Sequence, residues 1–182
     1  MRRATKRVLL ALLVPVAIAA VPLSGASAGN RGPTSATVAA VGGFEVEIND
    51  SFTNTFRFER DTVKIRSDGT VTWKNQTGFG EAHTITIATE ASLPSTIDEI
   101  FNCGAPGTAC EPASGHVDAN FNPIPGKEVL NAGPLGLDEV GDSLLLAPGG
   151  EISAVVSAPA GTELHYLCAI HPWMQGKIKV KG

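Results

Sequence analysis

The sequence lacks long runs with helical periodicity, a glycine-rich phosphate loop and a nucleophile–histidine–acid grouping. Charge is also sparse: Asp, Glu, Lys and Arg make up 18% of the 182 residues. These absences exclude a helical bundle and give no support to a nucleotide-binding or hydrolytic enzyme. There are only four His, three Cys and two Met residues, so the position of each one is informative.

Length and composition indicate one domain built from short strands. A chain of 182 residues that is 43% hydrophobic can bury one substantial core, but hardly two. Its 20 Gly and 12 Pro are scattered rather than periodic. This distribution is typical of many short strands joined by turns.

The first 28 residues have the pattern of a secretory signal. A basic start precedes an apolar run from Val8 to Val21, and Ala26-Ser27-Ala28 has the small-x-small form of a cleavage site. The run is interrupted by Pro15 and is shorter than the roughly 20 residues that span a bilayer. We therefore predict cleavage after about Ala28, secretion or export to a periplasm, and no stable membrane insertion afterwards.

Acidic residues dominate the rest of the chain. The predicted signal holds four of the 14 basic residues and none of the 18 acids, so cleavage makes the charge more negative. The segment from Thr84 to Glu151 contains ten acids and one base, Lys127. A surface of this sign argues against nucleic acid as a partner, because phosphate binding needs basic groups.

Apolar residues alternate with polar ones in two blocks, which predicts an all-β, antiparallel Greek-key β-sandwich. The alternation begins with Phe44, Val46 and Ile48 and predicts a buried sheet face there. It also places Trp73 and Tyr166 in the core. We expect a flexible lead-in over residues 29–43 and a single domain over 44–182, with an acidic insertion at about 89–145.

The insertion contains a predicted short helix and two of the cysteines. Thr96 and Glu99 form a capping-box pattern before an apolar pair. Cys103 and Cys110 are close enough in sequence to close a small disulfide loop worth about 2 to 3 kcal/mol. The acidic insertion is either a solvent-exposed segment held in place by the disulfide, or a docking surface that attracts a basic partner over long range.

Cys168 is then an unpaired thiol in an oxidising compartment, where a metal would protect it. His171 and Met174 follow it at intervals of three residues, in a tight loop between two strand-like runs. Thiolate, imidazole and thioether together suit copper. Two His, one Cys and a weak Met ligand form the trigonal site of blue-copper electron carriers.

The second imidazole must come from elsewhere in the chain, and His83 is the best candidate. It begins a β-run just after the turn Gly78-Phe79-Gly80. His165 precedes Cys168 by three residues, so on a strand it points to the opposite face. His116 lies in the insertion and is expected at the surface.

These residues resemble the cupredoxin family, in particular plastocyanin and amicyanin. The pattern Tyr166-x-Cys168-x-x-His171-Pro172-x-Met174 is similar to the family's copper loop, and Val71-Thr72-Trp73-Lys74-Asn75 followed by His83 is similar to its first ligand region. There are three departures. Arg60 stands where the family often has Pro, Thr84 stands where plastocyanin and amicyanin have Asn, and the segment between His83 and Cys168 is longer.

The resemblance implies one type 1 copper held by His83, Cys168, His171 and Met174. It implies a one-electron carrier rather than an enzyme, working between redox proteins such as a basic cytochrome, a dehydrogenase or an oxidase. Thr84 and Pro172 would support the ligands. Trp173 would either dock partners near the exposed His edge or pack in the core.

Three alternatives have different requirements. A protein that stores, delivers or senses copper would favour an open site rich in Met or His. A copper redox enzyme would need additional His ligands for a second centre. A purely structural β-sandwich would leave the spacing of Cys168, His171 and Met174 to chance.

Overall fold

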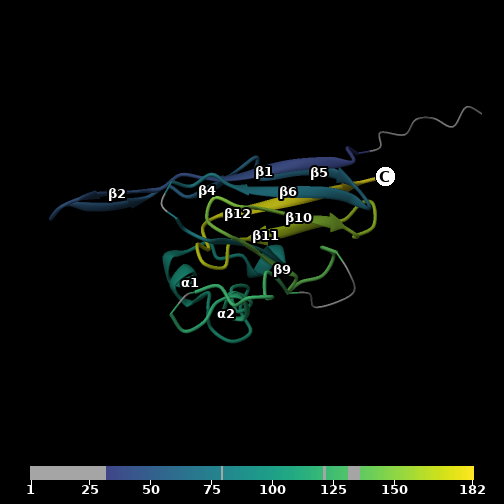
Figure 1. Cartoon of the computed structure of the whole chain (residues 1–182). Coiled ribbons are helices and arrows are strands. Elements are labelled where there is room, and N and C mark those ends of the chain that lie inside the picture. Colours follow the sequence, from purple (N-terminus) through teal and green to yellow (C-terminus); the bar gives the residue numbers. More distant parts are fainter. Residues whose placement is uncertain (1–31, 79, 121, 131–135) are drawn as a thin grey trace, which may run out of the picture.

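Two β-sheets pack face to face and form the body of the molecule in the computed structural model (Figure 1). The structure describes residues 32–78, 80–120, 122–130 and 136–182, so the predicted signal peptide lies outside the described residues. In spatial order, the first sheet consists of β10 (Glu151–Val156), β6 (Gly69–Asn75), β1 (Ser35–Val41) and β4 (Arg57–Glu59).

The second sheet contains the strands that lead into the candidate site. Its spatial order is β5 (Thr62–Arg66), β12 (Gln175–Lys181), β11 (Glu163–Leu167), β7 (His83–Ala88), β9 (Ser143–Leu146) and β8 (Val129–Leu130). The alternating apolar residues of both sheets meet between them. Val63 and Ile65 of β5, for example, are buried, while their polar neighbours are exposed.

The centre of the core is aromatic. Trp73 and Tyr166 have no exposed surface, and their rings meet edge to face with centroids 5.9 Å apart. Such pairs stabilise a core by about 0.5 to 1.5 kcal/mol beyond the burial of their surface. The prediction that both residues lie in the core is confirmed.

The predicted β-sandwich is confirmed, but its sheets are mixed rather than purely antiparallel. β1 pairs with β6 in parallel, and β5 pairs with β12 in parallel. The physical reason is that strands adjacent in a sheet are not consecutive in the chain here. The chain leaves one sheet and returns to it through the other, which permits parallel neighbours.

The expected flexible lead-in is partly wrong. Residues 35–41 form β1, which lies between β6 and β4, and Val38 and Ala40 are completely buried. The segment is rich in Ala, Ser and Thr, a composition that resembles a linker. Small side chains nevertheless fit the crowded centre of a sheet, so composition alone was misleading.

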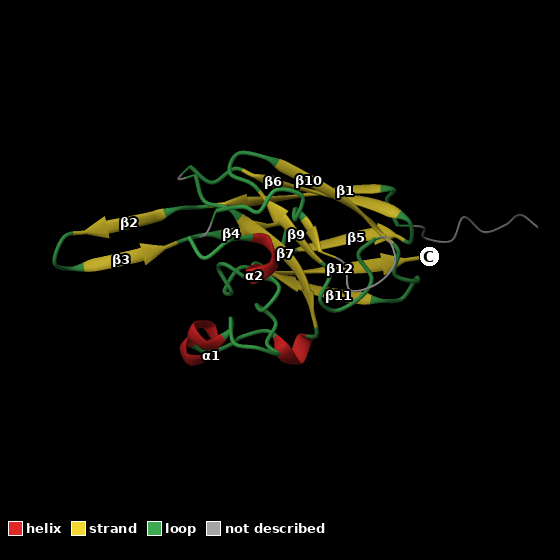
Figure 2. Ribbon diagram, turned by 60° about the horizontal axis from the view of Figure 1, so that its bottom comes forward, coloured by secondary structure: helices red, strands yellow, loops and turns green. Residues whose placement is uncertain are grey.

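The prediction of a buried sheet face around residues 44–48 holds for Phe44, which is half-buried and packs against the core, but it is wrong for Val46 and Ile48. β2 (Phe44–Glu47) and β3 (Ser51–Asn54) form a separate hairpin that extends beyond the sandwich (Figure 2). Val46 and Phe52 pair across it but remain 64% and 65% exposed. Period-two alternation identified the strand, but it could not show that no second layer covers it.

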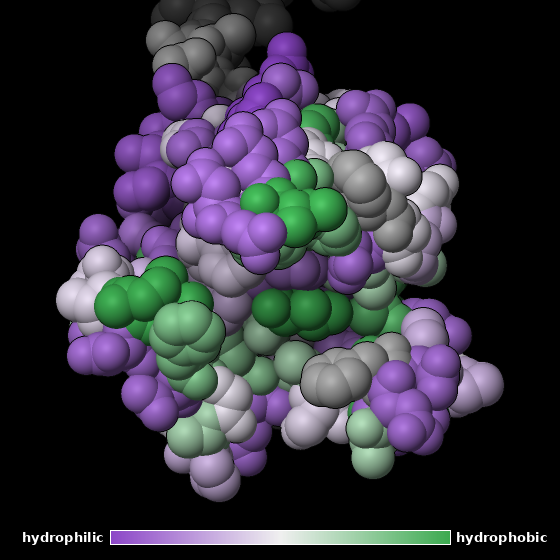
Figure 3. All heavy atoms as spheres, turned by 90° about the vertical axis from the view of Figure 1, so that its left-hand side faces the viewer, coloured by the Kyte–Doolittle hydropathy of each residue, from purple (hydrophilic) through white to green (hydrophobic). Residues whose placement is uncertain are grey.

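Figure 3 looks toward the end of the molecule from which the hairpin projects, and green apolar patches lie among purple polar residues there. Besides Val46 and Phe52, the large exposed apolar residues of the described chain include Ile48 of the hairpin turn and Phe101 of the insertion. Scattered apolar residues are normal on a protein surface.

The segment between β7 and β9 carries the helices and covers the outer face of β7. It contains η1 (Glu90–Ser92), α1 (Ile97–Asn102) and α2 (Ala113–His116). The predicted capping box of Thr96 and Glu99 begins α1, and the predicted Cys103–Cys110 disulfide is present. Because this segment covers β7, every residue of that strand is buried.

None of the helices in the described ranges is long and apolar enough to cross a membrane.

Candidate metal centre

Two segments far apart in the sequence form the candidate site. His83 is the first residue of β7, and Cys168 follows the last residue of β11. β7 and β11 are paired antiparallel neighbours, so the end of one strand lies beside the start of the other. His171 and Met174 belong to the loop between β11 and β12, which the same pairing brings to His83.

Three donor atoms converge there. The Nδ1 atoms of His83 and His171 each lie 3.7 Å from Cys168 Sγ, and the three donors lie within 4.8 Å of one another. Two ligands bound about 120° apart, at bond lengths of about 2.0 Å to nitrogen and 2.3 Å to sulfur, would be separated by about 3.7 Å. His83, Cys168 and His171 therefore fit a single metal ion.

The site is enclosed. His83 and Cys168 have no exposed surface, and His171 retains 8%. The other ring nitrogen of His83, Nε2, is buried with no hydrogen-bond partner among the described residues. The His83 nitrogen directed at the other donors is therefore Nδ1, which lies 3.7 Å from Cys168 Sγ.

Backbone hydrogen bonds hold the ligand loop in a tight turn. Met174 N–H donates to His171 O at 2.8 Å, His171 N–H donates to Cys168 O at 3.1 Å, and Cys168 N–H donates to Met174 O at 2.9 Å. The loop is thus closed on itself by its own backbone. Pro172 is buried within it and fixes one backbone dihedral.

Burial and hydrogen bonding act in opposite directions on the Cys168 thiol. Complete burial raises its pKa, whereas the backbone N–H groups of Thr84, His171 and Ile170 lower it. Thr84 N–H and His171 N–H lie 3.3 Å and 3.4 Å from Sγ. These donors favour the thiolate, which is the form that binds metals.

Both ligand histidines are held neutral. Burial lowers the pKa of His83 to about 4, with a further contribution from the nearby His171 ring. Burial also lowers the pKa of His171 to about 4. Neutral imidazole is the form that coordinates metals, so the rings are ready to bind at neutral pH.

Phe56 packs against both ligand rings, a contact that sequence reasoning missed. Its ring centroid lies 5.3 Å from that of His83 and 4.9 Å from that of His171, both close to edge to face. Phe56 alternates with Phe58 in sequence, which indicates a strand but does not distinguish a residue beside the ligands from any other core residue. These contacts restrict the rotation of the two imidazoles.

Met174 and Trp173 occupy different environments. Met174 is 1% exposed and belongs to the same apolar core cluster as Cys168. Its role as the weak fourth ligand remains a prediction. Trp173 is 41% exposed, and its ring centroid is 5.3 Å from that of His171. Of the two placements considered for Trp173, the structure has the one at the surface.

Thr84 ties the two ligand segments together. Its Oγ1 accepts a hydrogen bond from Ala169 N–H at 2.6 Å, and its own N–H donates to Cys168 Sγ. These bonds link the start of β7 to the loop after β11. The resemblance assigned such a link to an Asn, and a threonine provides one here.

The two remaining histidines lie away from the donors. His165 lies beside Glu163, with Nε2 3.4 Å from its carboxylate. His116 was predicted at the surface, but it has no exposed surface and hydrogen-bonds Ser143 and Lys127, so that prediction is wrong. Its polar sequence neighbours suggested a loop. The burial comes from β9, which is distant in sequence.

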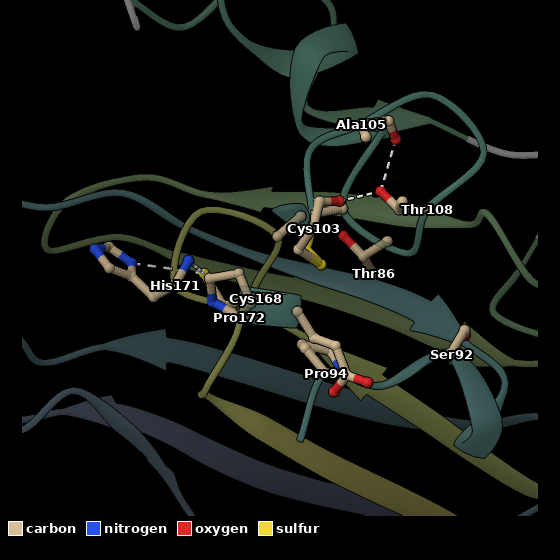
Figure 4. Close-up of a disulfide and its surroundings, with 12 residues drawn as sticks. Thr86, Ser92, Pro94, Cys103, Ala105, Thr108, Cys168, His171 and Pro172 are labelled. Atoms are coloured by element: carbon tan, nitrogen blue, oxygen red, sulfur yellow. Dashed lines mark hydrogen bonds between the residues drawn. A yellow bond between two sulfur atoms is a disulfide. The ribbon is translucent and has the colours of Figure 1, made fainter. Parts of the chain in front are cut away.

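The Cys103–Cys110 disulfide lies next to the ligand loop. Cys103, Cys110, Leu167 and Ala169 form one small buried cluster, so the insertion packs directly on the residues on either side of Cys168. Figure 4 shows this disulfide with Cys168 and His171. Gln175 adds a second link, because its side chain donates both to Pro94 O of the insertion and to Pro172 O of the loop.

Comparison with known proteins gives similarity at the level of solved structures. No family model and no curated protein matches the chain. An auracyanin from Roseiflexus castenholzii is 18% identical, with a TM-score of 0.45 over 83% of this chain and 99% of that one. A purple cupredoxin from Nitrosopumilus maritimus is 17% identical, with a TM-score of 0.39 over 80% and 98%.

An amicyanin from Paracoccus versutus is 16% identical, with a TM-score of 0.36 over 79% of this chain and 81% of that one. These similarities concern the fold.

Proposed function

We propose that this chain is an exported type 1 copper protein of the cupredoxin kind, which carries single electrons between redox proteins. The observation that carries the proposal is the buried convergence of His83 Nδ1, Cys168 Sγ and His171 Nδ1. One thiolate and two imidazoles select a soft or borderline metal, and with a thioether nearby they are the donor set of blue-copper sites.

Copper, when bound, would supply a reversible one-electron couple. His83, Cys168 and His171 would hold it, and Met174 would add the weak fourth contact. The residues around them keep the ligands in place, because the loop is closed by its own backbone hydrogen bonds and Phe56 packs on both rings. A site that keeps its shape lowers the reorganisation needed when an electron arrives or leaves.

Partners would approach the surface next to His171. Its ring is 8% exposed and is covered on one side by the exposed Trp173. This is the point where the candidate site comes nearest to solvent, because His83 and Cys168 have no exposed surface. We propose Trp173 as a contact for the electron donor or acceptor.

An electron carrier is a better explanation than the alternatives. Enclosed ligands do not suit rapid transfer of the metal itself, as storage or delivery would require. His116 and His165 contact other groups than the three donors, so we propose that the chain is a carrier rather than a copper enzyme.

The test is the visible absorption spectrum of the purified protein after addition of Cu(II). We expect an intense blue band that bleaches on reduction and is abolished by Cys168→Ala, because the band arises from the thiolate–copper bond. His165→Ala is the matched control, since this residue lies outside the site, and it should keep the band. The proposal is contradicted if the protein stays colourless with Cu(II), or if the Cys168→Ala variant keeps the band.

A further inference from the structure

A line of buried polar groups connects the insertion to the ligand loop. His116 Nε2 lies 2.8 Å from Ser143 Oγ, which lies 2.7 Å from Thr86 Oγ1. Thr86 Oγ1 lies 3.1 Å from Thr84 Oγ1, which accepts from Ala169 N–H beside Cys168. His116, Ser143, Thr86 and Thr84 all have no exposed surface. Bulk water therefore does not reach the side chains of this line.

The His116 end of the line fixes the direction of the hydrogen bonds between its side chains. At one end, His116 Nδ1 lies 2.5 Å from Lys127 O, which can only accept, so Nδ1 carries the proton. In the neutral ring Nε2 is then an acceptor. At the other end, Ala169 N–H can only donate, so Thr84 Oγ1 accepts from it.

Each hydroxyl has a single proton, and the order of donors follows. Ser143 donates to His116, Thr86 donates to Ser143, and Thr84 donates to Thr86. A Thr84 hydroxyl that donated to Cys168 would lower the pKa of the thiol, but in this order of donors the Thr84 proton goes to Thr86 instead. The sulfur is left with backbone N–H donors.

We propose that His116 is a positioning residue for the metal centre, which through Ser143 and Thr86 orients the Thr84 hydroxyl and so limits the hydrogen bonding of the Cys168 thiolate. This inference rests on the proposed copper function. His116 is the last residue of α2, which belongs to the insertion. The proposal therefore gives the insertion a role at the metal centre.

The neutral state that this role requires agrees with the surroundings of His116. Burial lowers the pKa of His116. This effect is larger than those of the Lys127 O hydrogen bond and the Glu128 carboxylate, which both raise the pKa. A neutral acceptor at Nε2 is thus expected at neutral pH.

Loss of the terminal acceptor should change the electronic properties of the site. Without His116 the line has no acceptor at that end, so we expect the order of donors to reverse and the Thr84 hydroxyl to donate to Cys168 Sγ. Without Thr86 the Thr84 hydroxyl loses its acceptor directly. A further hydrogen bond draws electron density from the thiolate and weakens its donation to the metal. Because the oxidised ion depends more on that donation, the reduction potential should rise.

Four variants test this in the full, copper-loaded protein. His116→Leu removes the acceptor, and Thr86→Val breaks the line at its middle with little change of shape. His116→Gln keeps an acceptor near the position of Nε2. Thr72→Val is the matched control, because Thr72 shares a similar 2.7 Å hydroxyl pair with Ser153 in the other sheet.

The readouts are the reduction potential and the position of the thiolate–copper band. We expect His116→Leu and Thr86→Val to raise the potential and move the band to shorter wavelength, while His116→Gln and Thr72→Val stay close to the wild type. If His116 had only a structural role, His116→Leu and Thr86→Val would lower the stability of the protein but would not share this change in potential and band position. Unchanged potentials in both His116→Leu and Thr86→Val overturn the proposal. If His116→Leu does not fold, Thr86→Val alone decides.

A measurement without metal separates this proposal from the copper function. Nitrogen NMR of the His116 ring in the metal-free protein should show the tautomer with its proton on Nδ1. The opposite tautomer, or a charged ring at neutral pH, contradicts the proposed direction of the line. A wild-type protein that shows no blue band with Cu(II) contradicts the copper function instead, whatever the state of His116.

Discussion

Gly176 lies where β12 passes closest to Tyr166. A Cβ atom at this position would meet the phenol ring end of Tyr166 and would lie 2.6 Å from Asp61 O. Neither group can move freely, because Tyr166 is fully buried and Asp61 O is part of the backbone. Close approach of the backbone is thus the reason for glycine here.

Gly176→Ala should therefore lower the free energy of unfolding by about 1 to 3 kcal/mol through overpacking. Urea unfolding monitored by circular dichroism measures the change. Gly78→Ala is the matched control, since no atom of the described residues beyond its chain neighbours lies within 4 Å of a Cβ at that position, and it should have little effect. Equal stabilities of the two variants would contradict this account of Gly176.

The two ligand histidines make the stability of the metal-free protein depend on pH. Their pKa values are about 4 in the folded chain, against 6.5 for an ordinary histidine. Between these values the unfolded chain binds more protons than the folded one, so stability falls as the pH is lowered from about 6.5 toward 4. Above that range the two rings contribute no pH dependence.

Urea unfolding of the metal-free protein at pH 7 and pH 5 checks this prediction. We expect a lower unfolding midpoint at pH 5, and His83→Gln should make the difference smaller because one of the two rings no longer titrates. A pH difference that is the same in His83→Gln as in the wild type would contradict the assignment.

At the scale of elements, the insertion is the unusual part of the molecule. It is stabilised by the disulfide, by the capping box of α1 and by the buried hydrogen bonds of His116. The cysteine pair and the capping pattern were predictable from sequence, because both depend on residues a few positions apart. The packing of the insertion on the ligand loop was not, because it depends on β7 and β9.

Replacing Cys103 and Cys110 with serine should lower the free energy of unfolding by about 2 to 3 kcal/mol, as expected for closure of a short loop. Thermal unfolding measures the change. Thr96→Ala, which removes only the helix cap, serves as the comparison and should cost about 1 kcal/mol. A disulfide variant as stable as the wild type would show that the covalent link does not hold the insertion in place.

At the scale of the whole molecule, charge is distributed unevenly. The chain carries a formal net charge of -4, and the segment from Thr84 to Glu151 has ten acids against one base. Exposed charges attract an approaching partner over about 8 Å at physiological salt, and less at higher salt. A basic redox partner should therefore react faster than an acidic one of equal driving force.

Stopped-flow kinetics with a basic cytochrome tests this steering. The bimolecular rate constant should fall as ionic strength rises, and Asp98→Asn with Glu139→Gln should weaken that dependence. Glu45→Gln with Glu47→Gln removes the same charge from the hairpin and is the matched control. If the hairpin pair has the larger effect, the acidic insertion is not the steering surface.

The donor set of the candidate site can be read from the local sequence. The spacing of Cys168, His171 and Met174 places three donors in one loop, and the alternation of apolar residues dictates strands. Both are local properties, since the first depends on a few neighbouring residues and the second on the two-residue period of a strand.

The surroundings of those donors depend on contacts between distant segments. The burial of His116, the packing of Phe56 on both imidazoles, the paired position of β1 and the exposure of the hairpin all depend on segments distant in sequence. A side chain's type limits the contacts that it can make, but the pairing of the sheets determines which groups it meets.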